Sequence, residues 1–282
     1  MILVVGANGR TGRLVVDELL AAGERPRLMV RNIQTAEERF GERVDIVAGD
    51  LNNTGSLQAA MQGCHAVFLC SPVSPSQVEQ QNAVIDAAAL NNAYVVKLSG
   101  LATYPDSFVD SGRWHARSEA YLAASGAPFT CLHPFCFMQN MDMQLPGIVK
   151  TGVLRSAVHK AAIAMVDVRD IAAVAAKLLC DPSLAPGQTL PLTSSSAHSY
   201  AEMAEIISEV LQRSVAFETQ TTADMQNTLQ NFGMPDWHIK IMLQFNRAFE
   251  DDLAATPHPA VREVLQRDPI SFEQYLKDAK WR

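Results

Sequence analysis

Three glycines near the amino terminus, Gly6, Gly9 and Gly12, have a spacing that suits a phosphate-binding turn. They follow the apolar run 1–5 and precede a segment whose apolar residues recur at helical spacing. The amino end of a helix has unpaired N–H groups and a partial positive charge, and glycines let a pyrophosphate approach this backbone closely. The pattern therefore predicts a dinucleotide site. The alternative is a glycine turn of an α/β protein that binds no ligand.

The second expected strand ends on a basic residue. Arg31 follows the apolar residues 28–30, and no acid stands beside it. An acid there would bind the ribose 2′-hydroxyl of NAD, whereas an arginine suits the 2′-phosphate of NADP. Arg10, inside the glycine turn, is expected to join Arg31 at this phosphate. We therefore expect NADP, with NADPH preferred over NADH. In the alternative, Arg31 only begins a solvated loop.

The first half of the chain alternates between strand and helix patterns. The expected strands are 1–5, 26–31, 44–48, 66–70, 94–98 and 128–132, and the longest helices between them are 77–91 and 111–125. This alternation predicts an α/β fold with a doubly wound parallel sheet of the Rossmann type. Ligands of such sheets bind beyond the carboxyl ends of the strands.

The pattern loosens after residue 137. Helices are expected at 166–179, 200–211, 235–253, 259–267 and 272–279, and one strand at 215–218. We expect residues 1–150, together with the returning segment 165–195, to form the dinucleotide-binding domain. Residues 196–282 are expected to form a smaller, mostly helical substrate-side lobe that does not fold independently.

Composition excludes several classes of partner. The 282 residues carry a net charge of −7, which argues against binding to nucleic acid or an anionic membrane. Five cysteines without a Cys-x-x-Cys pair suit a reducing compartment. The chain opens on a strand rather than a signal peptide, and the longest uncharged stretch, 120–141, holds too many polar residues and prolines to span a membrane. We therefore expect a cytoplasmic protein.

A series of short motifs resembles the NmrA-like family, an atypical branch of the short-chain dehydrogenase/reductases. In chain order these motifs are Gly6-Ala-Asn-Gly-Arg-Thr-Gly12, Val30-Arg-Asn32, Gly49-Asp-Leu51, Val67-Phe-Leu69, Val96-Lys-Leu-Ser-Gly100, Ser125-Gly-Ala-Pro-Phe-Thr130 and Pro134-Phe-Cys-Phe-Met-Gln-Asn140. The resemblance is dense over the first half and general over the rest. The family includes NADPH-dependent quinone and dye reductases, and inactive NADP-binding sensors that regulate partners.

The resemblance implies that residues at the strand ends bind the cofactor. Those that match the pyrophosphate loop are Gly6, Asn8, Gly9, Arg10, Thr11 and Gly12, and Arg31 matches the partner of the 2′-phosphate. Asp50 and Leu51 match the adenine contact, and Ser71 and Pro72 match the ribose side. Lys97 and Ser99 match the nicotinamide side. The loop that closes over the nicotinamide is matched by Pro134, Phe135 and Phe137.

The usual catalytic pair of the larger superfamily is absent. No tyrosine in the sequence is followed four residues later by lysine, and the matching helix carries His115 and Glu119 instead. We expect His115 to donate a proton, Glu119 to orient His115, and Lys97, whose pKa burial would lower, to act at the site. The alternatives are an exposed i,i+4 pair for His115 and Glu119, and a structural ion pair for Lys97.

Flat and flexible apolar side chains predict a planar acceptor. The candidate substrate contacts are Phe108, Trp114, Phe137, Met138 and Met141, and the alternative is that they are plain core. No metal is expected, because Cys131, His133 and Cys136 match no standard zinc spacing.

Two functions remain open. The first is an NADPH-dependent oxidoreductase that transfers hydride to a quinone-like or otherwise conjugated small molecule, because such an acceptor needs little help from a protein acid. The second is a catalytically silent NADP(H)-binding redox sensor that acts through a protein partner. Helices exposed on the sheet faces would permit a homodimer.

Overall fold

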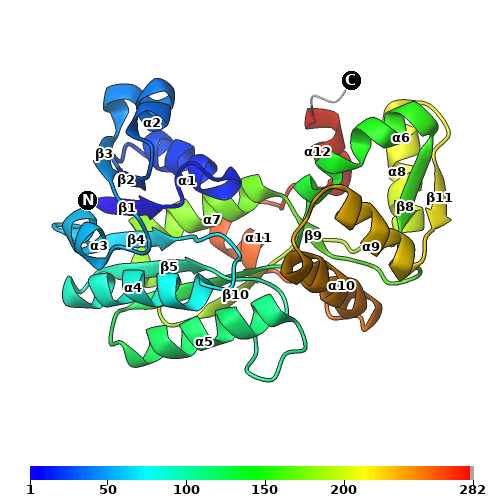
Figure 1. Cartoon of the computed structure of the whole chain (residues 1–282). Helices are drawn as coiled ribbons and strands as arrows, with labels where there is room; N and C mark the ends of the chain where they lie inside the picture. Colours follow the sequence, from blue (N-terminus) through cyan, green and yellow to red (C-terminus); the bar gives the residue numbers. More distant parts are fainter. Residues whose placement is uncertain (280–282) are drawn as a thin grey trace.

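A seven-stranded parallel sheet forms the centre of the molecule, which a computed structural model describes over residues 1–279 (Figure 1). Its strands are β1 (Ile2–Val5), β2 (Arg27–Val30), β3 (Asp45–Ala48), β4 (Ala66–Leu69), β5 (Tyr94–Leu98), β6 (Phe129–Pro134) and β10 (Thr189–Leu192). The strand order is β10-β6-β5-β4-β1-β2-β3, so the direction of winding reverses between β1 and β4. The predicted doubly wound sheet is therefore confirmed, and the switch point lies at β1.

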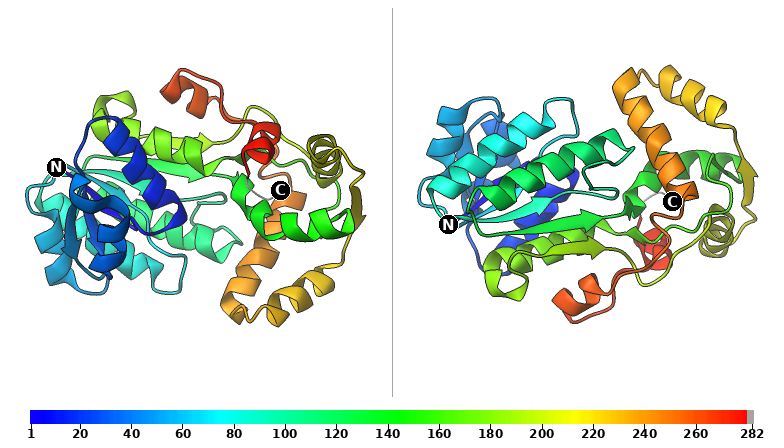
Figure 2. Two further views of the ribbon diagram at one scale, coloured as in Figure 1. Left: turned by 90° about the horizontal axis from the view of Figure 1, so that it is seen from above. Right: turned by 90° about the horizontal axis from the view of Figure 1, so that it is seen from below.

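Helices cover both faces of the sheet (Figure 2). One face carries α1 (Arg10–Ala21), α2 (Ile33–Phe40), α7 (Val168–Cys180) and α11 (Ala260–Leu265), and α1 packs along α7. The other carries α3 (Thr54–Met61), α4 (Gln77–Leu90) and α5 (Asp110–Ala124). Side chains of β1 alternate between the two apolar layers, which is why this strand is apolar throughout: Ile2 and Val4 face one layer and Leu3 the other.

A second lobe lies beyond the carboxyl ends of the strands (Figure 1). It contains β7 (Cys136–Phe137), η2 (Met138–Met143), α6 (Leu145–Thr151), β8 (Val153–Ser156), β9 (Met165–Val166), α8 (Tyr200–Leu211), β11 (Ala216–Thr219), α9 (Thr222–Asn231), α10 (Asp236–Glu250) and α12 (Phe272–Asp278). Two short parallel pairs, β7 with β9 and β8 with β11, connect these segments. The chain also forms short 3-10 turns η1 (Gly41–Arg43) and η3 (Pro182–Leu184).

The apolar clusters divide the chain differently from the predicted ranges. Leu145, Ile148 and Leu154 belong to the core of the second lobe, although residues up to 150 were expected in the first. Conversely, Ala260 and Val261 of α11 pack in the core beside the sheet. The chain therefore crosses between the two lobes repeatedly, and neither lobe is one continuous segment.

Side-chain caps begin two of these helices. Ser199 accepts a hydrogen bond from the Glu202 N–H and Glu202 bonds back, which completes a capping box at the start of α8. Asp167 caps α7 through the Arg169 N–H. Within residues 1–279, no helix is both long enough and apolar enough to cross a membrane.

Candidate functional site

The glycine turn joins β1 to α1 without room for side chains. Gly6 has a φ of +82°, a region that favours glycine, and its carbonyl accepts the Gly9 N–H at 2.9 Å. A Cβ at Gly6 would overlap the Cys70 carbonyl at the end of β4, and one at Gly12 would overlap the Gly6 carbonyl. The turn is therefore packed against both the end of β4 and the first turn of α1. This packing places the amino end of α1 at the carboxyl ends of the strands.

A cavity of about 530 Å³ lies beside this turn, at the ends of β1 to β4. Its lining includes eight of the predicted cofactor residues: Gly6, Asn8, Gly9, Arg31, Asp50, Leu51, Ser71 and Pro72. Thr11 and Gly12 are buried in the first turn of α1 behind it. The volume, the helix amino end and the glycine cradle fit one half of a dinucleotide, and Arg31 provides a cation at the β2 end.

Arg10 does not line this cavity. Its Nη1 atom donates a hydrogen bond to the Gln139 carbonyl in η2 at 2.9 Å. The expectation that Arg10 joins Arg31 at a 2′-phosphate stays a prediction, and in this structure the second lobe holds the Arg10 side chain. Arg10 instead links the glycine turn to that lobe.

A network of buried polar side chains lies past the ends of β5 and β6. Lys97 is fully buried, and its Nζ donates to the Ser99 Oγ at 2.6 Å. Ser99 in turn donates to the Glu119 Oε1, which lies 3.8 Å from the Lys97 Nζ. The His133 Nε2 is 2.8 Å from the same carboxylate oxygen. Residues from β5, α5 and β6 thus converge on Glu119.

These contacts change the pKa values of both charged partners. Burial acts to raise the pKa of Glu119, but the hydrogen bond from His133 and the charge of Lys97 outweigh it, so this pKa is lowered. Burial lowers the pKa of Lys97, and the nearby Glu119 carboxylate only partly opposes this. Lys97 forms the ion pair that was its structural alternative, with Glu119, and it also donates a hydrogen bond directly to Ser99.

His115 is a further neighbour of the Lys97 amine. Its Nδ1 is 3.1 Å from the Lys97 Nζ and 3.1 Å from the Gln77 Nε2. Burial, together with the charge of Lys97, lowers its pKa well below the ordinary value, so its imidazole is neutral near pH 7. Glu119 does not orient His115, which corrects that prediction. Nor do the two form an exposed helix pair, because both side chains turn inward on α5.

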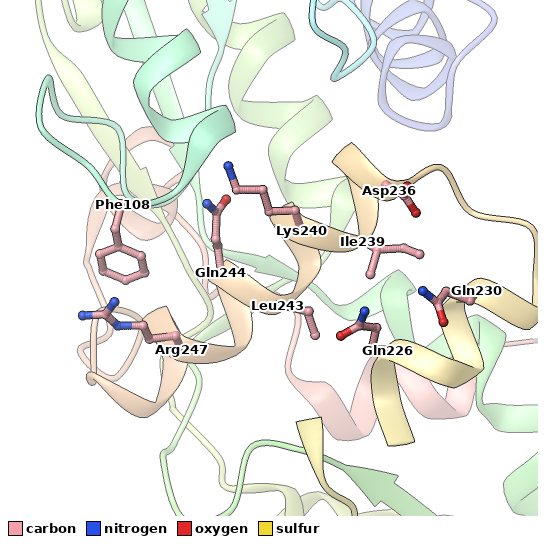
Figure 3. A pocket seen from close by; sticks show the side chains of 9 residues that line it. All are labelled: Phe108, Gln226, Gln230, Asp236, Ile239, Lys240, Leu243, Gln244 and Arg247. Carbon is pink, nitrogen blue, oxygen red and sulfur yellow. The ribbon is translucent and has the colours of Figure 1, made fainter. Parts of the chain in front are cut away.

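Two of the predicted acceptor contacts lie between the β5–α5 connection and the second lobe. Phe108 lines a cavity of about 620 Å³ together with residues of α9 and α10, and the Arg247 guanidinium lies 4.4 Å from its ring centre (Figure 3). Trp114 packs against Trp237 of α10, with ring centres 6.4 Å apart.

The other apolar candidates have structural positions. Met138 and Met141 are buried in the core of the second lobe, so the prediction that they line an open acceptor pocket is wrong. Both are held there by the tight η2 turn that follows β7. Phe137 packs on the core beside the sheet, and Phe135 meets His258 edge-on at a centroid distance of 5.7 Å. Pro134 is the last residue of β6.

The sequence patterns missed several residues of this region. His133 follows the predicted strand 128–132 and was given no catalytic role, yet it contacts Glu119. The cavity beside Phe108 is lined by polar residues of α9 and α10 that were given no site role: Gln226, Gln230, Asp236, Lys240, Gln244 and Arg247. The α10 members share one stripe of the helix, so their periodicity was readable in advance. Nothing local indicated which way that stripe faces.

The sheet order and the glycine cradle at its switch point define the chain as a protein of the dinucleotide-binding Rossmann class. Its family model match is more specific: residues 1–276 match the NmrA-like family, and the chain belongs to that family. The chain is 32% identical over 278 residues to an NAD(P)H azoreductase of Xenophilus azovorans, covering 98% of this chain and 97% of the relative.

Solved structures with the same fold cover almost the whole chain. An NADPH-dependent quinone oxidoreductase of Escherichia coli in complex with NADPH has a TM-score of 0.89 at 21% identity, covering 98% of each chain. The triphenylmethane reductase of Citrobacter sp. in complex with NADP(H) has a TM-score of 0.88 at 22% identity, covering 99% of each chain. At this identity, these two structures establish the shared fold.

Proposed function

We propose that the protein is an NADPH-dependent reductase of planar, conjugated small molecules, with quinones and azo compounds as the expected acceptors. The observation that carries the proposal is the arrangement of two groups of residues along the carboxyl ends of the strands. The glycine cradle and Arg31 lie at one end of this row of strand ends, and the Lys97–Ser99–Glu119–His133 network lies at the other. The azoreductase of Xenophilus azovorans, which matches along nearly the full length, supports the same class.

The first half of this row would hold the adenosine and pyrophosphate. Backbone N–H groups at the start of α1 would bind the pyrophosphate, and Arg31 would pair with the 2′-phosphate. The dinucleotide would then continue past β4 toward β5 and β6, where Ser99 lies at the strand end. When bound, NADPH would supply the hydride, and the protein would hold the acceptor against it in a site closed to water.

The residues at β5 and β6 favour a conjugated acceptor over a simple ketone. The tyrosine–lysine pair that supports carbonyl reduction elsewhere in the superfamily is replaced by His115 and Glu119, and His115 is buried behind Lys97. A quinone or azo group delocalises the incoming negative charge, so it requires less of a protein acid. We propose the cavity beside Phe108 and Arg247 for the outer part of the acceptor, because its aromatic and polar lining suits a planar molecule with polar substituents.

The test is oxidation of NADPH by the purified protein with a naphthoquinone, an azo dye, an enone and a saturated ketone. We expect turnover with the quinone or the azo dye and none with the saturated ketone, and faster turnover with NADPH than with NADH. A parallel binding titration separates the outcomes. Tight NADPH binding without reduction of any acceptor would reject the reductase and favour the silent redox sensor.

A further inference from the structure

We propose that Ser99 is the terminal proton donor of the reaction, and that Glu119 and His133 return the proton to it from solvent. This proposal rests on the proposed reductase function and adds to it the source of the proton. It assigns a direct chemical role to Ser99. Glu119, His133 and Lys97 act through that serine.

Ser99 lies at the carboxyl end of β5, the edge of the sheet where ligands of such folds bind. It follows β5 directly, and its N–H donates to the Leu132 carbonyl at 2.8 Å, so the end of β6 fixes its backbone. No atom lies within 4 Å of the position that a Cβ would take at Gly100, the next residue. The backbone of Ser99 is therefore fixed at this edge of the sheet, and the free space beside Gly100 leaves room for an acceptor next to it.

The hydroxyl of Ser99 can make the hydrogen bonds that a proton relay requires. A hydroxyl has one donor and two acceptor positions. Lys97 occupies one acceptor position at 2.6 Å, and the hydroxyl donates to Glu119 when that carboxyl is ionised. When Glu119 carries a proton, the direction of the Ser99–Glu119 bond reverses. The serine proton is then free to point toward the open side.

His133 connects the network to water. Its side chain is 16% exposed and that of Glu119 is 18% exposed, whereas that of Lys97 is 0% exposed. Lys97 therefore cannot exchange protons directly with solvent in this conformation, and it serves to position the Ser99 oxygen. His115 lies behind Lys97 and reaches Ser99 only through it.

The proton balance of the reaction determines when the relay is needed. A quinone that takes a hydride from NADPH becomes a hydroquinone monoanion and leaves NADP⁺. The oxyanion takes the Ser99 hydroxyl proton, Ser99 takes one from the Glu119 carboxyl, and Glu119 regains one from solvent through its hydrogen bond with His133. A triarylmethyl cation, by contrast, becomes a neutral product on receiving hydride alone.

This difference gives a paired test on the full-length enzyme with NADPH. Single-turnover rates are measured with a naphthoquinone and with a triarylmethyl dye cation. Ser99→Ala and the nearly isosteric Glu119→Gln are each expected to lower the ratio of the quinone rate to the dye rate by at least about tenfold. Ser118→Ala is the control, since it removes a buried hydroxyl one residue before Glu119 that has no hydrogen-bond partner within residues 1–279.

Equal slowing of both acceptors in Ser99→Ala and Glu119→Gln would overturn the relay, because it would mean that these residues only position the cofactor. Wild-type protein that reduces neither acceptor would reject the reductase function itself. A second measurement needs only the quinone. Wild-type reduction should be slower in heavy water than in ordinary water, and this difference should shrink in Ser99→Ala. The same isotope effect in both proteins would also overturn the relay.

Discussion

Arg31 is the residue whose charge we expect to decide between the two nicotinamide cofactors. It lines the cavity at the end of β2 and has no ion-pair partner within residues 1–279. Charge-assisted hydrogen bonds contribute about 1.5–3 kcal/mol, so Arg31→Glu should weaken NADPH binding by about 10- to 100-fold. NADH, which has no 2′-phosphate, should lose much less affinity.

Fluorescence titration of both cofactors measures this change. Arg25→Ala is the matched control, because Arg25 is exposed just before β2 and lies outside the cavity. Unchanged NADPH affinity in Arg31→Glu would show that Arg31 only begins a surface loop.

At the scale of single residues, the sequence indicates the lining of the cavity beside the glycine turn better than the contacts past the ends of β5 and β6. Gly6, Arg31 and Asp50 were predictable because each follows directly from a strand end in a known topology. Glu119 and His133 meet only because α5 packs beside β6, a contact that no local pattern encodes. Spacing along α5 placed His115 and Glu119 together, whereas in the structure each of them approaches the Lys97 Nζ.

At the scale of elements, the close packing of α1 on β1 depends on the absence of a side chain at Gly12. Gly12→Ala places a Cβ against the Gly6 carbonyl, and overpacking of this kind costs about 1–3 kcal/mol. We expect a lower free energy of unfolding and weaker NADPH binding, because the helix must move away from the turn. Urea unfolding with and without the cofactor measures both effects.

Gly147→Ala is the control for helix propensity. Gly147 is exposed in α6, and nothing lies within 4 Å of its missing Cβ. This change should raise the free energy of unfolding by about 0.5–1 kcal/mol. Equal effects of the two substitutions would show that the contact at Gly12 is unimportant.

Elements with a clear hydrophobic pattern were predictable, whereas β10 and α9 were not. The predicted bounds of β5 and α8 agree with the structure. β10 was missed because it is four residues long and contains Pro191, which an edge strand tolerates. α9 was missed because it buries no residue, so it has no apolar stripe to read.

At the scale of the whole molecule, the buried histidine makes stability depend on pH. His115 has a pKa well below its ordinary value of 6.5 in the folded protein, because burial and Lys97 disfavour its charged form. Below pH 6.5 the unfolded chain therefore binds a proton that the folded protein does not. The free energy of unfolding should fall as pH drops below this value, with a slope approaching about 1.4 kcal/mol per pH unit.

Urea unfolding at a series of pH values from about 7 to about 5 tests this slope. His115→Gln should flatten it, whereas His159→Gln, which changes an exposed histidine, should keep it. Glu119 has a lowered pKa, so its contribution is lost only below its ordinary value of 4.5 and lies outside this window. An unchanged slope in His115→Gln would contradict the assignment.

The packing of α1 along α7 also affects how the protein is made. Residues 10–21 leave the ribosome early with an apolar face, but their partner, residues 168–180, follows only after more than half of the chain. β6 likewise stays an open sheet edge until β10 emerges at residues 189–192. The nascent chain therefore carries the unpaired apolar face of α1 for more than half of its synthesis, and such exposed surface favours aggregation until residues 168–192 have emerged.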